Sequence, residues 1–208
     1  MKNAVTLLHF GAGDELHAAA GWASTGGLTE EKRKRIPDFL MRLGKSVPRH
    51  TVPFEHSQIT FLVTAEYASH IHQLKHRIGV SVNAESARYQ EFKEDKFYIP
   101  SEWPKEIQKE LEAHCLHSFE LYHSTIKSLV SSGMNRKRAK ETARYFLTIA
   151  TQINFVVTFN FLSFTHFLML RNSSEAQLEI CMIASEMLRL VKTETKDSFQ
   201  HSLAAFGL

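Results

Sequence analysis

The chain has 208 residues, 43% hydrophobic and 23% charged, which excludes a disordered protein and predicts one core-forming domain over residues 1–208. A formal net charge of +3 favours an enzyme with small anionic substrates over a protein that binds duplex nucleic acid. Cys115 and Cys181 are far apart in the sequence and form no disulfide or metal-binding pattern. The sequence begins without a signal-peptide pattern, so we expect a cytoplasmic protein.

The first predicted elements are a strand over residues 5–10 and a helix from Asp14 to Ala23, with Asp14 as its N-cap. Gly11-Ala12-Gly13 stands between them and matches the start of a dinucleotide-binding fingerprint. The third glycine of that fingerprint would fall on Leu16, so the pattern argues against a Rossmann site.

The next helical segment begins after Thr29, a suitable N-cap, and is kinked or restarted by Pro37. It carries the basic run Lys32-Arg33-Lys34-Arg35. A nucleic-acid patch and a solvated helix face both explain such a run, and we favour the solvated face.

A loop bounded by prolines, residues 48–56, carries two histidines and a glutamate ahead of a strand from Ser57 to Ala65. A helix that starts at Glu66 follows, and the cations Lys75 and Arg77 stand at its end with the imidazole of His76 between them. The link that comes after them is short, apolar and prone to turn.

The second half of the sequence is predicted to be rich in helices. Ser101 is the expected N-cap of a long helix that ends at Gly133. Asn135 is the expected N-cap of the next helix, which carries Arg144 near its middle.

The segment 147–170 is the most apolar part of the sequence. It contains the polar residues Gln152, Asn154, Asn160 and His166. Because each would be costly in hydrocarbon, we expect a buried strand or helix at a subunit interface and not a membrane span. Ser174 and Gln177 form a capping box for the last predicted helix.

The spacing of possible metal ligands argues against a metal site. His72 and His76 are four residues apart, and Glu120 stands three residues before His123. These spacings occur in zinc and di-iron sites, but no HExxH motif and no second ExxH pair accompany them. Both cysteines lie in apolar helical patterns, so we expect neither to be a reactive thiolate.

The candidates that remain are cations in apolar surroundings, concentrated in the segment 75–89. Lys75, Arg77 and Arg88 belong to this segment, and Arg144 and Arg171 follow further along. An anion-binding site and an ordinary set of surface or paired charges both explain them.

The segment 75–89 resembles the signature of flavin-dependent thymidylate synthases, which reads Arg-His-Arg, seven residues, Ser, any residue, Arg and Tyr. Here the signature reads Lys75-His76-Arg77, eight residues, and Ser86-Ala87-Arg88-Tyr89. The loop His50-Thr51-Val52-Pro53-Phe54-Glu55-His56 is similar to the family's His-x-Ser/Thr-Pro-Phe-Glu-His loop.

Two further blocks agree with that family. Arg144 stands sixteen residues before Asn160, as the corresponding arginine and asparagine do in the family. Phe167 and Arg171 then occupy the family's Phe-x-x-x-Arg positions. The resemblance therefore covers four ordered blocks from residue 50 to residue 179.

The resemblance implies a mixed α+β domain, with a central mostly antiparallel sheet flanked by long helices, that assembles as a homotetramer. It implies FAD as the cofactor, NADPH and methylenetetrahydrofolate as co-substrates, and reductive methylation of dUMP to dTMP. We expect no nucleic-acid partner and no membrane partner.

Carried over by position, the resemblance assigns three groups of side chains. The expected dUMP contacts are Ser86, Arg88, Arg144, Arg171, His72 and Glu85. The expected FAD contacts are Lys75, His76, Arg77, Ile78, Glu55, Asn160, His166 and Leu170. The expected catalytic residues are Arg171, Arg144 and His50. Positive charge beside the uracil would favour an electron-rich pyrimidine.

The sequence departs from the family pattern mainly on the flavin side. The linker after Arg77 is one residue longer, so the backbone around Gly79-Val80 is expected to bulge or loop. Lys75 replaces an arginine and keeps the charge but not the fork geometry. Other usual residues are replaced by Val52, Leu162, Glu175 and Thr148. Two alternatives stay open: C5 methylation or hydroxymethylation of another pyrimidine nucleotide such as UMP, and an inactive nucleotide- or flavin-binding module.

Overall fold

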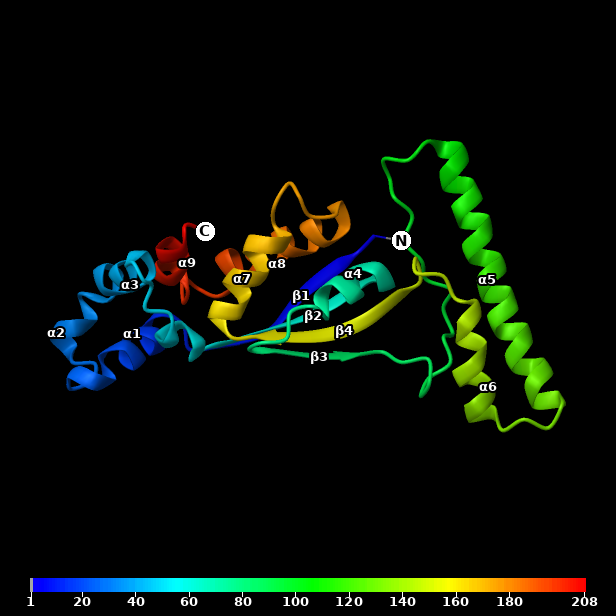
Figure 1. The fold of residues 1–208 in the computed structure, drawn as a ribbon, viewed down its shortest axis with the longest axis horizontal. Helices are drawn as coiled ribbons and strands as arrows, with labels where there is room; N and C mark the ends of the chain where they lie inside the picture. The colour runs from blue at the N-terminus through cyan, green and yellow to red at the C-terminus, as the bar shows by residue number, and fades with distance from the viewer. Residues whose placement is uncertain (1) are drawn as a thin grey trace. The chain divides into compact units, whose positions relative to one another are not determined.

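The structure is a computed structural model that describes residues 2–208. Within them an antiparallel sheet of four strands has the order β1-β2-β4-β3, and the helices follow β1 in the chain, lying between and after the strands (Figure 1). The strands are β1 (Ala4–Gly11), β2 (Gln58–Glu66), β3 (Val80–Ala84) and β4 (Gln152–Phe159). The α+β class predicted from the sequence is confirmed.

The helices differ widely in length. The longer ones are α1 (Asp14–Trp22), α3 (Ile36–Lys45), α5 (Lys105–Ser131), α6 (Arg136–Ala143), α7 (Phe161–Arg171) and α8 (Leu178–Glu194). The shorter segments are η1 (Ala23–Thr25), α2 (Glu30–Arg33), η2 (Val52–Glu55), α4 (Tyr67–Gln73), η3 (Arg144–Phe146) and α9 (Gln200–Phe206). Across residues 2–208, no helix has the combined length and apolar character needed to span a membrane.

The chain divides into two compact units. The first unit comprises residues 64–73 and 83–155 with the first residues of the chain, and the second unit comprises residues 5–63, 74–82 and 156–208. Each strand of the sheet contributes residues to both units. The single domain expected over residues 1–208 stays a prediction.

The first unit is built on α5, which packs against α6 and η3 (Figure 1). Its buried stripe includes Cys115, Phe119 and Tyr122. The Tyr122 hydroxyl accepts a hydrogen bond of 3.3 Å from the backbone N–H of Phe92. Burial raises the pKa of the Cys115 thiol, which keeps this side chain protonated at neutral pH.

The second unit has an aromatic core. The fully buried rings are Phe54, Phe61, Phe159, Phe161, Phe164, Phe167 and Phe199. Phe161 and Phe199 stack with their centroids 5.5 Å apart and their planes at 3°. Helix α9 packs against α3, where a Cβ on Gly44 would come within 2.8 Å of Ala205 (Figure 1). Glycine therefore permits this close helix contact.

Two predicted helix caps are confirmed by hydrogen bonds. The Thr29 side chain accepts from the backbone N–H of Lys32 at 3.3 Å, and the Asn135 side chain accepts from that of Lys137 at 2.9 Å. Pro37 lies in the first turn of α3, so the helix restarts there as predicted.

Other predicted helix ends were wrong. Asp14 is the first residue of α1, and its carboxylate instead accepts from the backbone N–H groups of His201 and Ser202 at 2.7 and 2.8 Å. Helix α5 begins after Pro104 and not after Ser101, since a proline disfavours helical backbone in the residue before it.

The remaining corrections concern α6 and α8. Helix α6 ends at Ala143, so Arg144 begins η3 and does not lie mid-helix. The capping box predicted at the start of α8 is absent from this part of the described chain, where Gln177 is the N-cap without a side-chain cap bond. The Gln177 amide donates to Glu179 at 2.7 Å, which takes it away from the expected cap.

Candidate active site

In the second unit, the signature histidine contacts one of the predicted catalytic arginines. Arg171 Nε donates a hydrogen bond of 3.0 Å to His76 Nε2. Because a guanidinium can only donate, His76 Nε2 must carry a lone pair. Burial, helped by the positive charges of Arg171 and His166, lowers the pKa of His76 to about 4. His76 is therefore neutral at physiological pH and acts as an acceptor for Arg171.

Aromatic contacts fix the ring of His76. It meets Phe167 edge-on at 5.1 Å between centroids and His166 at 6.0 Å. His76 is 8% exposed, whereas His166 is exposed. Helix α7 thus supplies both the arginine that His76 binds and the rings that hold it.

The lengthened linker turns at Gly79, which has a φ of +65°. A Cβ at Gly79 would collide with Ser163 Oγ and Asn160 Nδ2, so glycine is required by space as well as by backbone conformation. The Asn160 N–H donates to the Gly79 carbonyl at 3.0 Å, and Ser163 Oγ donates to the Ile78 carbonyl at 2.7 Å. The start of α7 therefore fastens the linker.

Asn160 has a structural contact in addition to its predicted flavin contact. Its side chain caps α7 by accepting from the backbone N–H of Ser163 at 2.8 Å. The other predicted flavin residues nearby, Lys75, Arg77, Ile78 and Leu170, are exposed. Ile78 has 91% of its surface exposed, which places an apolar side chain in solvent beside two cations.

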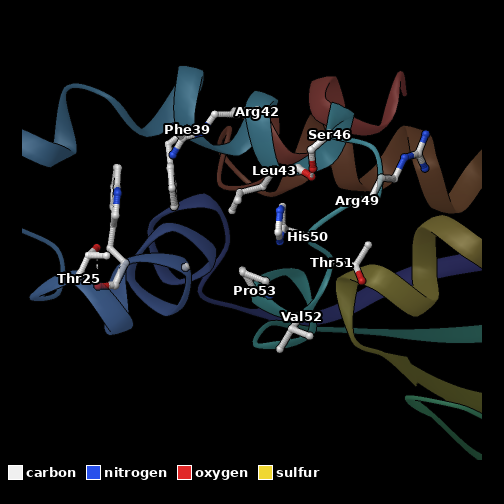
Figure 2. Close-up of a pocket in the computed structure, with 12 residues that line it drawn as sticks. Thr25, Phe39, Arg42, Leu43, Ser46, Arg49, His50, Thr51, Val52 and Pro53 are labelled. Carbon is white, nitrogen blue, oxygen red and sulfur yellow. Dashed lines mark hydrogen bonds between the residues drawn. The ribbon is translucent and has the colours of Figure 1, made fainter.

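His50 lies in a different part of the second unit, at a cavity of about 630 Å³ (Figure 2). Trp22 and Phe39 stack in this cavity with centroids 3.9 Å apart, and Arg42 and Arg49 supply positive charge. None of the residues that line the cavity belongs to the segment 75–89, and none is acidic. Glu55, at the end of η2, is exposed and is not among the lining residues.

In the first unit, the signature ends in a hydrogen-bonded turn. The Ser86 carbonyl accepts from the N–H groups of Tyr89 and Gln90 at 3.0 and 3.1 Å. Ser86 Oγ accepts from the N–H of Arg88 at 3.3 Å, which leaves the hydroxyl proton as a donor for a ligand oxygen. The Arg88 guanidinium lies over the Tyr89 ring at 5.6 Å. A hydroxyl and a guanidinium thus meet on one short turn.

Helix α6 supports this turn. Glu141 Oε1 accepts from Arg88 Nε at 3.3 Å, and its other oxygen accepts from Arg138 Nη1 at 3.4 Å. Lys140 Nζ donates to the Tyr89 carbonyl at 3.1 Å. The turn is therefore held through a side chain and through its backbone.

Other predicted nucleotide residues of the first unit have their own partners. Glu85 Oε2 accepts from both the backbone and the side-chain nitrogen of Asn154, at 3.2 and 3.3 Å. Arg144 lies near Tyr67, whose pKa is raised by burial although the charge of Arg144 partly lowers it. His72 is half-buried on α4.

The structure therefore groups the predicted residues in two sets. One set lies along α7, where His76 contacts Arg171 at the end of the helix and the linker at Ile78 and Gly79 is held by its start. The other set is Ser86 and Arg88, on the turn after β3. The sequence patterns did not identify Glu141, which contacts Arg88, or Ser163, which contacts Ile78. Ser163 could have been found from its place three residues after the N-cap Asn160, whereas Glu141 carries no comparable local signal.

The sequence profile of the family described as "Thymidylate synthase complementing protein" matches residues 6–195. The chain belongs to this family. Named relatives agree: the "Flavin-dependent thymidylate synthase" of Clostridium tetani is 32% identical over 186 residues, covering 84% of this chain and 72% of that protein. The protein of the same name from Thermosipho africanus is 33% identical over 187 residues, covering 83% and 77%. The resemblance seen in the sequence is confirmed, and the names of these relatives state a dependence on flavin.

Solved structures share the fold of this chain. "UMP/dUMP methylase PolB" from Streptomyces cacaoi, bound with 5-Br dUMP, aligns with a TM-score of 0.77 at 26% identity. The alignment covers 99% of this chain and 95% of that one. A second structure of PolB, bound with 5-Br UMP, aligns with a TM-score of 0.76.

Proposed function

We propose that this protein is a flavin-dependent thymidylate synthase that converts dUMP to dTMP. The C5 hydrogen of the uracil is replaced by a methyl group, whose carbon comes from methylenetetrahydrofolate. NADPH supplies two electrons and, with one proton, the two hydrogens that balance the reaction. Membership of the family and the intact Ser86-Ala87-Arg88-Tyr89 turn carry this proposal.

The turn supports the phosphate end of the proposal. A phosphate dianion is well matched by a hydroxyl donor and the planar donor fork of a guanidinium. Ser86 keeps its hydroxyl proton for such a contact, and the side chain of Arg88 is 49% exposed. We assign both to the dUMP phosphate, with Glu85 and His72 beside the nucleotide.

The chain's own residues fit a flavin. Lys75 and Arg77 present exposed positive charge next to the exposed apolar side chain of Ile78. A planar ring system joined to a diphosphate needs such surfaces. We assign FAD to Lys75, His76, Arg77, Ile78, Glu55, Asn160, His166 and Leu170. Bound FAD supplies the redox chemistry of the reaction.

The protein contributes positioning and charge. We propose that Arg171 and Arg144 lie beside the uracil, where positive charge stabilises an electron-rich pyrimidine, and that His50 is the third catalytic residue. Neutral His76 holds Arg171 through Nε, which fixes the plane of its guanidinium. The mechanism needs no thiolate, in keeping with the buried, protonated Cys115.

A second candidate function is the same chemistry on UMP. It is favoured by the likeness to PolB, which is named as a methylase of both UMP and dUMP. Ribonucleotide and deoxyribonucleotide differ only in the 2′-hydroxyl, so the phosphate turn alone does not separate them.

For either substrate, we propose that the protein assembles as a homotetramer and is located in the cytoplasm.

The decisive experiment measures release of tritium from C5-labelled dUMP and UMP. The purified protein is supplied with FAD, NADPH and methylenetetrahydrofolate, and each component is omitted in turn. We expect release from dUMP that requires all of them and is far weaker with UMP. Equal release from both nucleotides would replace the leading proposal with the UMP/dUMP alternative. A colourless protein that takes up no FAD and releases no tritium would contradict both.

The division of roles within the signature has its own test. Arg88→Ala is expected to weaken dUMP binding at least tenfold, because a charge-assisted phosphate contact is lost, and to leave FAD binding unchanged. The matched control is Arg189→Ala, which removes an arginine paired with Glu186 on α8. Loss of FAD binding by Arg88→Ala, with dUMP binding intact, would show that the roles are assigned wrongly.

A further inference from the structure

The Glu141 carboxylate on α6 is the acceptor that holds the side chain of Arg88. The two side chains are 53 positions apart in the sequence and meet at 3.3 Å through Arg88 Nε. The Glu141 side chain is 17% exposed and that of Arg88 is 49% exposed. An ion pair this open to water adds little to stability, so its value lies in the orientation that it gives the arginine.

The guanidinium nitrogen that contacts Glu141 decides the orientation of the Arg88 side chain. A guanidinium has its Nε on one side and its paired Nη groups at the end. Because Glu141 takes the Nε side, the end formed by the two Nη groups of Arg88 is directed to other acceptors. A phosphate binds best to two parallel N–H donors, which these two groups provide.

The turn has two further restraints. The Tyr89 ring lies against the guanidinium at 5.6 Å, and Lys140 Nζ holds the Tyr89 carbonyl at 3.1 Å. Lys140 and Glu141 are neighbours on α6, so one stretch of helix fixes both the backbone of the turn and the arginine that it carries. Such preorganisation reduces the entropy that a ligand must overcome.

We propose that Glu141 is a positioning residue for the nucleotide phosphate, acting through Arg88. The inference rests on the proposed function, because it takes the anion at Ser86 and Arg88 to be the phosphate of dUMP. The opposite effect is also physically possible, since a carboxylate near a dianion repels it. The direction in which removal of the Glu141 charge changes the affinity for dUMP therefore decides between positioning and repulsion.

Glu141 keeps its charge over the working range of pH. Partial desolvation raises the pKa of its carboxyl, but the hydrogen bonds and charges of Arg88 and Arg138 outweigh this and leave it below its ordinary value. The positioning contact is consequently present wherever the phosphate is a dianion.

The test is Glu141→Gln, which keeps the shape of the side chain and removes its charge. Calorimetry with the full-length protein measures the dissociation constants of dUMP and of deoxyuridine, which lacks the phosphate. We expect the constant for dUMP to rise about fivefold, the effect of one weakened charged contact, and that for deoxyuridine to stay the same. Glu186→Gln, which breaks the exposed pair with Arg189, is the matched control and should change neither.

A double variant separates the inference from the function beneath it. If Glu141 acts through Arg88, then Glu141→Gln has no further effect on dUMP binding in an Arg88→Ala background. Unchanged or tighter dUMP binding in Glu141→Gln, while Arg88→Ala weakens it, would overturn the positioning role alone. Unchanged binding in Arg88→Ala would overturn the phosphate assignment itself. Equal losses for dUMP and deoxyuridine would show a general structural defect and overturn the inference.

Discussion

Acid should destabilise this protein through one buried histidine of the second unit. His17 is 0% exposed and lies between two serine hydroxyls, with Ser202 Oγ 2.7 Å from Nδ1 and Ser57 Oγ 2.7 Å from Nε2. Burial, together with the nearby His56, lowers the pKa of His17 from 6.5 to about 3. Protonation would put a charge into an aromatic core, and the serine hydroxyl that donates to the ring would have to turn and accept instead.

The sign and size of the effect follow from proton linkage. The unfolded chain protonates His17 below pH 6.5 and the folded protein does not until about pH 3. The stability that His17 contributes is thus complete above pH 6.5 and is lost as the pH falls toward 3. At pH 5 the loss is about 2 kcal/mol, since one pKa unit corresponds to about 1.4 kcal/mol.

Other groups also titrate, so the prediction concerns a difference between variants. The lowered pKa values of His70 and His76 act in the same direction as that of His17. Asp14 acts in the opposite direction: burial raises its pKa, so its contribution is complete at low pH and is lost as the pH rises. Replacing His17 alone leaves the pH-dependent contributions of His70, His76 and Asp14 unchanged.

The assay is urea denaturation at pH 8 and pH 5 for the wild type and for His17→Gln, whose amide can still donate and accept. We expect His17→Gln to be less stable at pH 8 but to lose about 2 kcal/mol less than the wild type between the two pH values. His114→Gln, at an exposed position of α5, is the control and should follow the wild type. Equal losses for His17→Gln and the wild type would refute the reasoning.

Three further predictions concern helix α7 and the residues that contact its two ends. Gly79→Ala should lower the free energy of unfolding by about 3 kcal/mol, because its Cβ would collide with α7 at a positive φ, whereas Gly133→Ala, with nothing within 4 Å, should cost about 1 kcal/mol. Similar urea midpoints for these two variants would argue against the close approach. Asn160→Ala should cost about 1 kcal/mol through loss of the α7 cap, and an unchanged midpoint would count against that role. His76→Ala should lower kcat/KM for dUMP about tenfold by leaving Arg171 Nε without this acceptor, and His76→Gln should recover part of it; equal activity of the two would contradict the acceptor role.

The sequence predicted the elements that local pattern determines. Strands β1 and β2 were found from alternating apolar residues, and Thr29 and Asn135 were found as caps because capping acts within one turn. Strand β3 was missed for two reasons. It is short, and its residues, Val80–Ala84, lie inside a segment that was predicted to turn. Helix α9 was missed because its cap is Asp14, which the sequence places at the other end of the chain.

The difference between local patterns and contacts distant in the sequence also applies to the candidate site. The turn at Ser86 and Arg88 is local, so the family motif that contains it was recognisable in the sequence. The contact from Glu141 to Arg88 joins different elements, and no periodicity in the sequence announces it. The pairing of His76 with Arg171 is similar: the family resemblance supplied both residues, but only the fold shows that one accepts from the other.

The cap that Asp14 provides for α9 affects how the protein is made. Its partners His201 and Ser202 are 187 and 188 positions further along the chain. At the usual 5 to 20 residues per second, a ribosome needs roughly 10 to 40 s to reach them after Asp14. During that time His17 and the rings around it lack the α9 side of their core. The nascent chain therefore leaves apolar surface of this core uncovered until residues 200–206 have been made.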